Sequence, residues 1–532
     1  MSEAVGTFLV YIVESFTGSV IEYSSVTARC RRASSDDDAE GQAVVQVEEN
    51  NVLSDFTDFD PDDNVFQEFD PPPGCTGKMA WKLSRPPLWK SALTCFKTVL
   101  IMQLLFGSGI GLLAIAVAVI DFNTADLCYE KTLTWHSMPR LIQSIRVTGQ
   151  SIEGFLIQLW HFCVMLCMFG FSTMKELNLL AVNLLAAFTD VSYRLFLQIF
   201  GIYKRSWMSY PLNALFASVV IANSLIIAKR VIPSRLYNKK RLCKVAGLLA
   251  LQFIFGLTIS SLLVYKIFLW YDEKSEIEKV FIAGMSPLVV TIPKVMTRTA
   301  VPKLNFVHPG VLHLLVSTLY TGSALVFRVM QAELMSFRLF VALGVGHAVV
   351  DLVERVTVTM RDYLWEYMYK LLSHCGTSQA RNFRAGQART PRSMRFVADI
   401  SIQLLLTEAT ALVSAVGFIQ LYKFMYPDNL PTSEYYFWDL IWGFLVRCVT
   451  GLAIDVIFNT ISVWLQVMFC NVAVLKVWNS KKWRFHVIAN VVSTVMVVLY
   501  FSEYLFAIVR EKNDGKTAKR FAFNCSLPFS KF

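Results

Sequence analysis

Charged side chains are scarce in this chain of 532 residues. Only 17% of its residues are Asp, Glu, Lys or Arg, whereas soluble domains average ~25%. Apolar residues make up 55%, and the mean hydropathy is +0.47. This composition argues against an ordinary soluble protein and predicts an integral membrane protein whose first partner is the lipid bilayer.

Basic residues are missing from one stretch altogether, because no Lys or Arg occurs between Ala33 and Gly77. Residues 1–77 carry 16 acidic and 3 basic side chains, a net charge of −13, so the rest of a chain with a total of +10 carries about +23. Like charge with little apolar surface predicts a disordered acidic tail. Ser34 and Ser35 precede the run Asp36–Asp38 and are candidate phosphorylation sites, with a plain solvated tail as the alternative.

A basic region is also missing before the first apolar stretch, residues 4–13. This stretch is too short to span a bilayer, and it makes a poor signal peptide. It predicts a short interfacial or partner-docking helix. Phe56, Phe59, Phe66 and Phe69 recur among the acids of the tail, a pattern that could dock on the basic groove of a cytoplasmic protein partner.

Signatures of familiar catalytic and binding sites are lacking as well. No phosphate-binding loop, zinc-type Cys/His spacing or Ser–His–Asp set can be read from the chain. His161, Cys163 and Cys167 are too few ligands for a metal site. We therefore predict no cofactor, no metal and no enzyme, with an intramembrane lipid enzyme using His347 and Asp351 as the remaining alternative. The excess of basic residues lies beside apolar spans, which indicates topology rather than nucleic-acid binding.

What the sequence has in abundance is apolar runs of membrane-spanning length. They predict an all-α, polytopic transmembrane helix bundle of ten or eleven spans over residues 78–509, followed by a short C-terminal tail at 510–532. The basic residues before the first span and the linker 229–244 place the N-terminus in the cytoplasm. The expected spans are 98–120, 152–172, 177–201, 208–228, 245–269, 308–328, 334–356, 397–421, 438–460 and 485–509.

One further apolar segment, 280–293, contains Pro287 and Pro293. Its length favours a re-entrant loop and the charge of the loops after it favours a crossing; we favour a broken crossing. Eleven crossings would place Asn524, in the sequon Asn524-Cys525-Ser526, outside as a candidate glycosylation site. Basic residues between 510 and 520 argue against that placement.

Ionisable residues inside the spans are the main functional signal. Asn183, Asp190 and Arg194 lie on one stripe of the helix expected at 177–201. The same spacing, an Asp followed four residues later by a polar partner, recurs as Asp351 with Arg355 and as Asp455 with Asn459. His347 lies one turn before Asp351, and Arg447 two turns before Asp455.

Such residues are costly in lipid and should face a shared interior. The first hypothesis is a transporter or channel-like protein that moves a small ion or solute along them. The alternative is a non-transporting membrane receptor or scaffold that acts through its acidic tail and basic loops, because each Asp already has a local partner to pair with. Gly107, Gly109 and Gly111 predict close helix packing in the first span. The oligomeric state is left open.

Overall fold

The structure is a computed structural model that describes residues 66–74, 80–121, 135–202, 206–232, 237–304, 306–357, 391–425, 434–480 and 482–517. Several predictions fall outside these described residues: the interfacial helix at 4–13, Ser34, Ser35, most of the basic loop 370–395, and Asn524.

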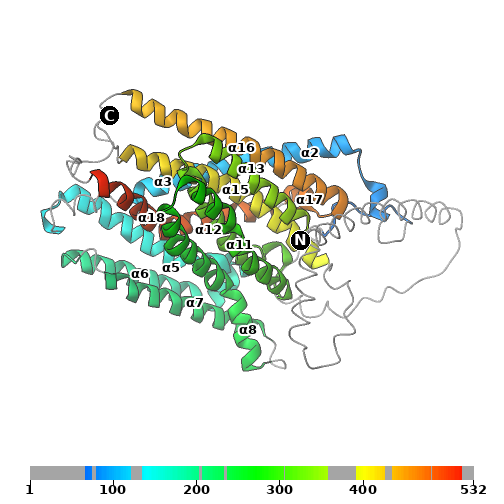
Figure 1. Ribbon diagram of the computed structural model, residues 1–532. Coiled ribbons are helices and arrows are strands. Elements are labelled where there is room, and N and C mark those ends of the chain that lie inside the picture. Colours follow the sequence, from blue (N-terminus) through cyan, green and yellow to red (C-terminus); the bar gives the residue numbers. More distant parts are fainter. Residues whose placement is uncertain are drawn as a thin grey trace, which may run out of the picture.

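Every regular element within the described ranges is a helix, as the all-α prediction requires (Figure 1). The α-helices are α2 (Leu88–Leu100), α3 (Ser108–Asp121), α5 (Arg140–Glu176), α6 (Leu179–Ile199), α7 (Ser209–Val231), α8 (Lys239–Leu249), α9 (Thr258–Leu262), α10 (Leu269–Asp272), α11 (Glu276–Ala300), α12 (Leu314–Glu333), α13 (Phe337–Val356), α15 (Pro391–Met425), α16 (Glu434–Cys470), α17 (Val474–Asn479) and α18 (Trp483–Thr517). Wider π turns, η3 (Ile101–Gly107), η7 (Gln252–Leu257) and η8 (Leu263–Phe268), join some of them into longer rods. The short 3-10 turns are η2 (Ala80–Ser84), η4 (Trp135–Ser137), η5 (Ser206–Met208), η9 (Val301–Lys303) and η10 (Pro309–Val311).

Ten helices within the described ranges are long and apolar enough to cross a membrane, which is compatible with a multi-pass membrane protein. α13 has 20 residues and is not among the ten because it carries four charged residues, Arg338, Asp351, Glu354 and Arg355. If α13 is counted with these ten, the described residues contain eleven candidate spans, the upper number predicted from the sequence. α8 and α17 lie at one end of the bundle, and α18 runs from the α17 end to the opposite end (Figure 1).

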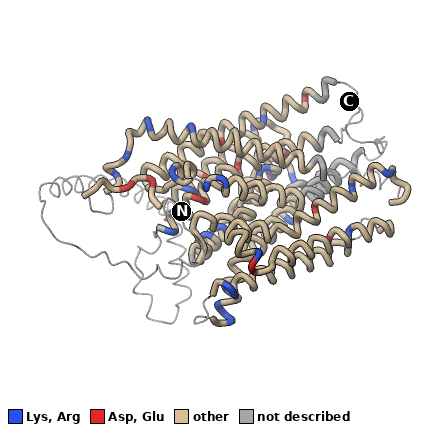
Figure 2. The backbone as a smooth tube through the Cα atoms, turned by 180° about the vertical axis from the view of Figure 1, so that it is seen from behind, with Lys and Arg blue, Asp and Glu red and all other residues tan. Residues whose placement is uncertain are grey.

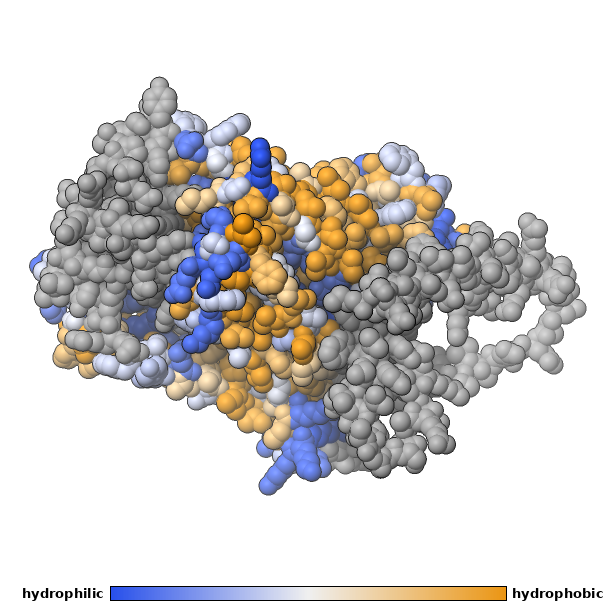
Figure 3. Space-filling view, viewed as in Figure 1, coloured by the Kyte–Doolittle hydropathy of each residue, from blue (hydrophilic) through white to orange (hydrophobic). Residues whose placement is uncertain are grey.

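Two helices, α12 and α15, form the centre of the bundle. In their apolar windows 89% and 94% of the residues are buried, against 28–56% in the other eight. The outer helices instead expose large apolar side chains such as Phe188, Ile199, Phe281 and Trp442. A broad apolar surface with hydrophilic patches is visible on one face of the molecule (Figure 3). Contiguous apolar surface of this kind is unusual on a soluble monomer and suits contact with lipid.

The Pro-containing segment 280–293 is part of one continuous helix, α11, of 25 residues. The apolar stretch is short, but the helix extends beyond it on both sides, so the length argument for a re-entrant loop is wrong. Pro287 has no N–H for the carbonyl of Ala283, and the Ser286 hydroxyl donates to that carbonyl at 2.9 Å instead. Side-chain hydroxyls thus replace part of the backbone bonding that proline removes.

Residues 66–74 are placed differently from the sequence prediction. They belong to the acidic stretch expected to be disordered, yet they lie against the turn between α16 and α17, where the backbone of Phe69 is hydrogen-bonded to Asn471. For these residues the prediction of disorder is wrong, because polar and aromatic contacts of the bundle hold them in place.

Glycines set how closely α3 approaches α15. A Cβ on Gly107 would lie 2.6 Å from Cβ of Ala409, and one on Gly111 would lie 2.7 Å from Cβ of Val413. The close approach lets the Thr410 hydroxyl donate to the Gly107 carbonyl at 3.0 Å. Gly109 faces open space, since a Cβ there would have no neighbouring atom within 4 Å. Two of the three glycines are therefore required by packing.

This contrast gives a test of the helix contact. Gly111→Ala should lower the free energy of unfolding by about 1–3 kcal/mol, because the new methyl group overlaps Val413 and the two helices must separate. Gly109→Ala, the matched control two residues away, should leave stability unchanged or slightly raised. Thermal unfolding of the purified proteins in one detergent measures both. Equal melting temperatures for the two variants would contradict the packing.

Candidate functional site

Charged and polar side chains from four neighbouring helices meet in one buried group, which we call the charge network. α13 contributes residues four apart, which therefore lie on one face of that helix. The network consists of Arg328 of α12, His347, Asp351 and Arg355 of α13, Glu408 of α15, and Asp455 and Asn459 of α16.

Arg328 and Asp455 form the first pair of the network. Nη2 of Arg328 donates to both carboxylate oxygens of Asp455, at 2.8 and 2.7 Å, and both side chains are 2% exposed. Nη1 of Arg328 donates to Oε1 of Gln331 at 2.9 Å, and Gln331 in turn donates to the carbonyl of Phe340 at 2.9 Å. The pair therefore joins α12 to α16 and is anchored to the start of α13.

Arg355, Glu408 and Asn459 form a closed triangle. Nη1 of Arg355 donates to Oδ1 of Asn459 at 2.6 Å, and Nη2 donates to Oε1 of Glu408. Nδ2 of Asn459 closes the triangle by donating to Oε2 of Glu408 at 3.0 Å. Both oxygens of the Glu408 carboxylate are thus bound, each by a different helix. Such complete hydrogen bonding is what makes a buried ion pair tolerable.

A small cavity opens beside this triangle. Its volume is about 30 Å³, and its ionisable lining residues are Lys294 of α11, His347, Asp351 and Glu408. Nε2 of His347 lies 3.2 Å from Oδ2 of Asp351, and Glu408 lines the same cavity. The imidazole of His347 packs on the Phe327 ring, with 3.9 Å between centroids.

The charges in and beside the network balance. Three cations, Arg328, Arg355 and Lys294, face three carboxylates, Asp351, Glu408 and Asp455. A further pair flanks them, with 3.5 Å between Nη1 of Arg298 and Oε1 of Glu354. Since the formal charges cancel, this interior needs no bound ion to be neutral when all three carboxylates are ionised.

Asp190 lies in a different buried group, between α5 and α6. It accepts from Nε of Arg194 at 2.6 Å, the pairing expected from the sequence, and from Nε2 of Gln158 at 2.8 Å. Nη1 of Arg194 also lies 3.5 Å from Oε2 of Glu153. A Cβ at Gly154 would overlap the Asp190 carboxylate, so this contact depends on glycine.

Two other predicted residues satisfy helix contacts away from the charge network. Asn183, on the same buried side of α6 as Asp190, exchanges amide hydrogen bonds with Asn223 of α7, at 3.1 and 2.9 Å. Arg447 donates to the carbonyls of Ala332 and Leu334 at 2.7 and 3.0 Å and so covers the C-terminal end of α12. Of the predicted residues, the structure therefore brings together His347, Asp351, Arg355, Asp455 and Asn459.

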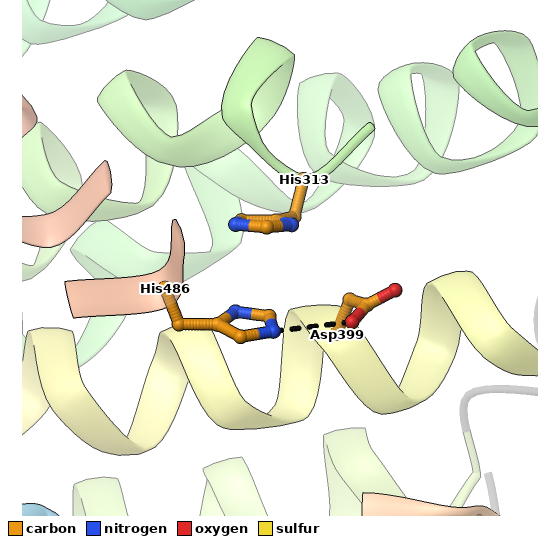
Figure 4. A group of neighbouring side chains, drawn as sticks. All are labelled: His313, Asp399 and His486. Carbon is orange, nitrogen blue, oxygen red and sulfur yellow. Dashed lines mark hydrogen bonds and ion pairs between the residues drawn. The ribbon is translucent and has the colours of Figure 1, made fainter. Parts of the chain in front are cut away.

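A third buried cluster contains two histidines that the sequence analysis did not single out (Figure 4). His313, Asp399 and His486 are fully buried, and their potential ligand atoms all lie within 4.8 Å of one another. The His313 and His486 rings stack with 4.1 Å between centroids, Nε2 of His486 is 3.1 Å from Oδ1 of Asp399, and Nε of Arg395 is 3.1 Å from Oδ2.

These three residues could hold a metal ion only after a rearrangement. Imidazole binds a metal in the plane of the ring at about 2.0–2.1 Å, and the two rings lie nearly parallel, at 19°. One ring would have to turn before both could reach the same ion. As arranged, the group is a hydrogen-bonded cluster in which Arg395 neutralises Asp399, and it joins α15 to α18.

Sequence reasoning missed Arg328, Glu408 and Asp399. Each lies within an expected span, 308–328 or 397–421, and an ionisable residue in an apolar span is itself a signal. They were passed over because none of them begins the pattern of an Asp with a polar partner four residues later. Arg328 and Glu408 have their charged partners on other helices, and the basic partner of Asp399 on its own helix, Arg395, lies four residues before it rather than after it.

The chain has no match among known proteins, whether it is compared with protein-family models, with curated proteins or with solved structures.

The Arg328–Asp455 pair permits a test of how the network contributes to stability. Arg328→Met and Asp455→Leu should each lower the free energy of unfolding by about 3–5 kcal/mol, because each leaves a buried charge unpaired. The double variant removes both charges and should lose less stability than the two single variants added together. A double-mutant cycle measured by unfolding in one detergent gives the coupling energy.

Arg230→Met and Glu176→Leu supply the control cycle. Their ion pair is 3.1 Å long but lies at the surface, with side chains 50% and 63% exposed, so its coupling should be near zero to 1 kcal/mol. If the coupling energy of Arg328 and Asp455 is no larger than that of this surface pair, the buried ion pair seen in the structure is contradicted.

Proposed function

We propose that the protein is a membrane transporter that moves a small ion, and that the ion binds in the charge network. The supporting observation is the cavity lined by Lys294, His347, Asp351 and Glu408. Ionisable groups inside an apolar helix bundle are costly, by roughly 2.5–3.5 kcal/mol each on insertion scales, and generally mark a path or a binding site. A cavity lined by four of them is where such an ion would be held.

The size of the cavity favours a proton over a larger ion or solute. A volume of about 30 Å³ suffices for two or three water molecules at most, since each needs about 10–15 Å³. Asp351 and Glu408 both line this cavity, and a carboxylate can take up a proton where there is no room for a hydrated ion. We infer that a proton bound here is the transported or coupling ion.

A second candidate function has its own support. The formal charges of the network cancel within the protein, and each member has hydrogen-bond or ion-pair partners there. A network of this kind also suits a receptor or scaffold, in which buried charges hold helices in register. Such a protein would act through its cytoplasmic tail and loops.

We further infer that the α8 and α17 end of the bundle faces the cytoplasm. α8 begins with Lys239, Lys240 and Arg241, and α17 contains Lys476. Both helices lie at one end (Figure 1), and Lys and Arg positions occur along the chain there when it is viewed from behind (Figure 2). Positive charge beside spans favours the cytoplasmic side. The tail segment bound near α17 would then be cytoplasmic too.

Proton movement can be measured directly. The purified protein is reconstituted into potassium-loaded vesicles that contain a pH-sensitive dye, and valinomycin imposes a membrane potential. We expect the wild type to acidify or alkalinise the vesicle lumen according to the sign of the potential. Asp351→Asn should reduce this flux to the level of empty vesicles, because an amide cannot take up the proton.

Asp190→Asn is the matched control, since it removes a buried carboxylate of the other group, between α5 and α6. It should retain flux at equal amounts of reconstituted protein. An equal loss of proton flux in both variants would mean that the buried carboxylates affect flux only through the stability of the protein. Wild-type vesicles with no flux under proton, sodium, potassium or chloride gradients would contradict transport and favour the receptor or scaffold.

A further inference from the structure

Residues 66–71 of the acidic stretch are bound like a peptide ligand at the turn between α16 and α17. The turn is made by Asn471, which follows the last residue of α16 and has a left-handed backbone with φ of 55°. This conformation presents the Asn471 side chain and carbonyl to the passing chain. We call the surface formed by Trp81, Asn471 and Lys476 the tail groove.

Asn471 recognises the backbone of the bound segment. Its Oδ1 accepts from the N–H of Phe69 at 2.8 Å, and its Nδ2 donates to the carbonyl of the same residue at 3.1 Å. The N–H of Glu68 lies 3.4 Å from the Asn471 carbonyl. One amide side chain thus satisfies both backbone groups of a single residue, and this recognition does not depend on the identity of that residue.

Lys476 binds the acidic side chains of the segment. Its backbone N–H donates to Oε2 of Glu68 at 3.1 Å, and its Nζ lies 2.8 Å from Oδ2 of Asp70. Glu68 is buried, at 8% exposed, and this burial raises the pKa of its carboxyl group. The groove therefore selects an acid at the position before the aromatic residue and another after it.

Phe69, the aromatic residue between the two acids, is recognised through packing contacts. The Phe69 ring stacks on Trp81 with 6.5 Å between centroids and 12° between planes. The Arg85 guanidinium lies over the same Trp81 ring, 4.8 Å from its centroid. Phe69 also packs against an apolar cluster that includes Val472 and Ala473. Backbone, two acids and one aromatic ring together define a short recognition sequence.

The same sequence occurs a second time, ten residues earlier. Residues 66–71 read FQEFDP and residues 56–61 read FTDFDP. The two copies agree in both phenylalanines, in the final Asp-Pro and in the acidic character of the third position. Each side chain that Trp81 and Lys476 contact in the bound copy has its counterpart in the other copy, as Asp58, Phe59 and Asp60.

We propose that the tail groove is a binding site for the sequence Phe-x-acid-Phe-Asp-Pro, and that residues 56–61 occupy it in exchange with residues 66–71. Both copies are on the same chain, so each is present at the groove at an effective concentration on the order of millimolar. The copy at 66–71 has the longer acid, Glu68, which reaches the Lys476 N–H. The copy at 56–61 has Asp58 there, one methylene shorter, and binds more weakly.

The experiment uses the full chain in detergent and a fluorescent peptide of residues 54–64, SDFTDFDPDDN. In the wild type both internal copies compete with the peptide, so anisotropy should show little binding. Phe59→Ala with Phe69→Ala weakens both copies, and this double variant should bind the peptide. Phe69→Ala alone leaves residues 56–61 as a competitor, so its apparent Kd should be higher than that of the double variant, on the order of tenfold.

Asn471→Gly added to the double variant is the control for the site. Glycine keeps the left-handed backbone without strain but removes the amide that binds the Phe69 backbone, so peptide binding should be lost while the melting temperature is retained. A peptide that fails to bind the double variant, or that binds equally with Gly at 471, would overturn the groove as a peptide site. Equal affinity of the single and double variants would overturn the exchange.

Discussion

The Glu408 carboxylate is the interaction on which the arrangement of the central helices depends. It lies on α15, whose apolar window is 94% buried, and its side chain is only 6% exposed. Its two oxygens are bound instead by Arg355 of α13 and Asn459 of α16. Loss of either partner would leave a buried carboxylate oxygen without a hydrogen bond, which is costly, and α13 and α16 must therefore stay where their side chains reach α15. Arg328 extends the same constraint to α12 through Asp455.

Sequence reasoning located the charged helices better than it paired their side chains. Spacing of four residues correctly pairs Asp190 with Arg194, at 2.6 Å, and His347 with Asp351, at 3.2 Å. The same spacing suggested Asp351 with Arg355 and Asp455 with Asn459, and both pairings are wrong. Arg355 and Asn459 bind Glu408, and Asp455 is bound by Arg328, 127 residues away in the chain. Periodicity shows which residues share a helix face, whereas contacts between helices depend on how the rods pack. The predicted common interior therefore holds two of the three aspartates, and Asp190 has its own.

The limits of the helices were predictable where apolar length alone decides them. The expected spans at 177–201 and 208–228 agree closely with α6 and α7. α11 was harder, because Pro287 and Pro293 read as interruptions until the Ser286 hydroxyl is seen at the freed carbonyl. The bound segment at 66–71 was harder still to predict from the sequence. Its composition indicates disorder, and only the three-dimensional placement of Asn471 reveals a partner for it.

Pro287 has a second consequence, because it and Ser286 line the cavity beside Asp351 and Glu408. A helix is easiest to bend where a backbone hydrogen bond is already absent. On α11 that point lies level with the two carboxyl groups, and a rotatable hydroxyl can keep its bond to Ala283 as the angle changes. α11 thus contributes to the wall of the cavity a turn that can bend without the loss of a further backbone hydrogen bond.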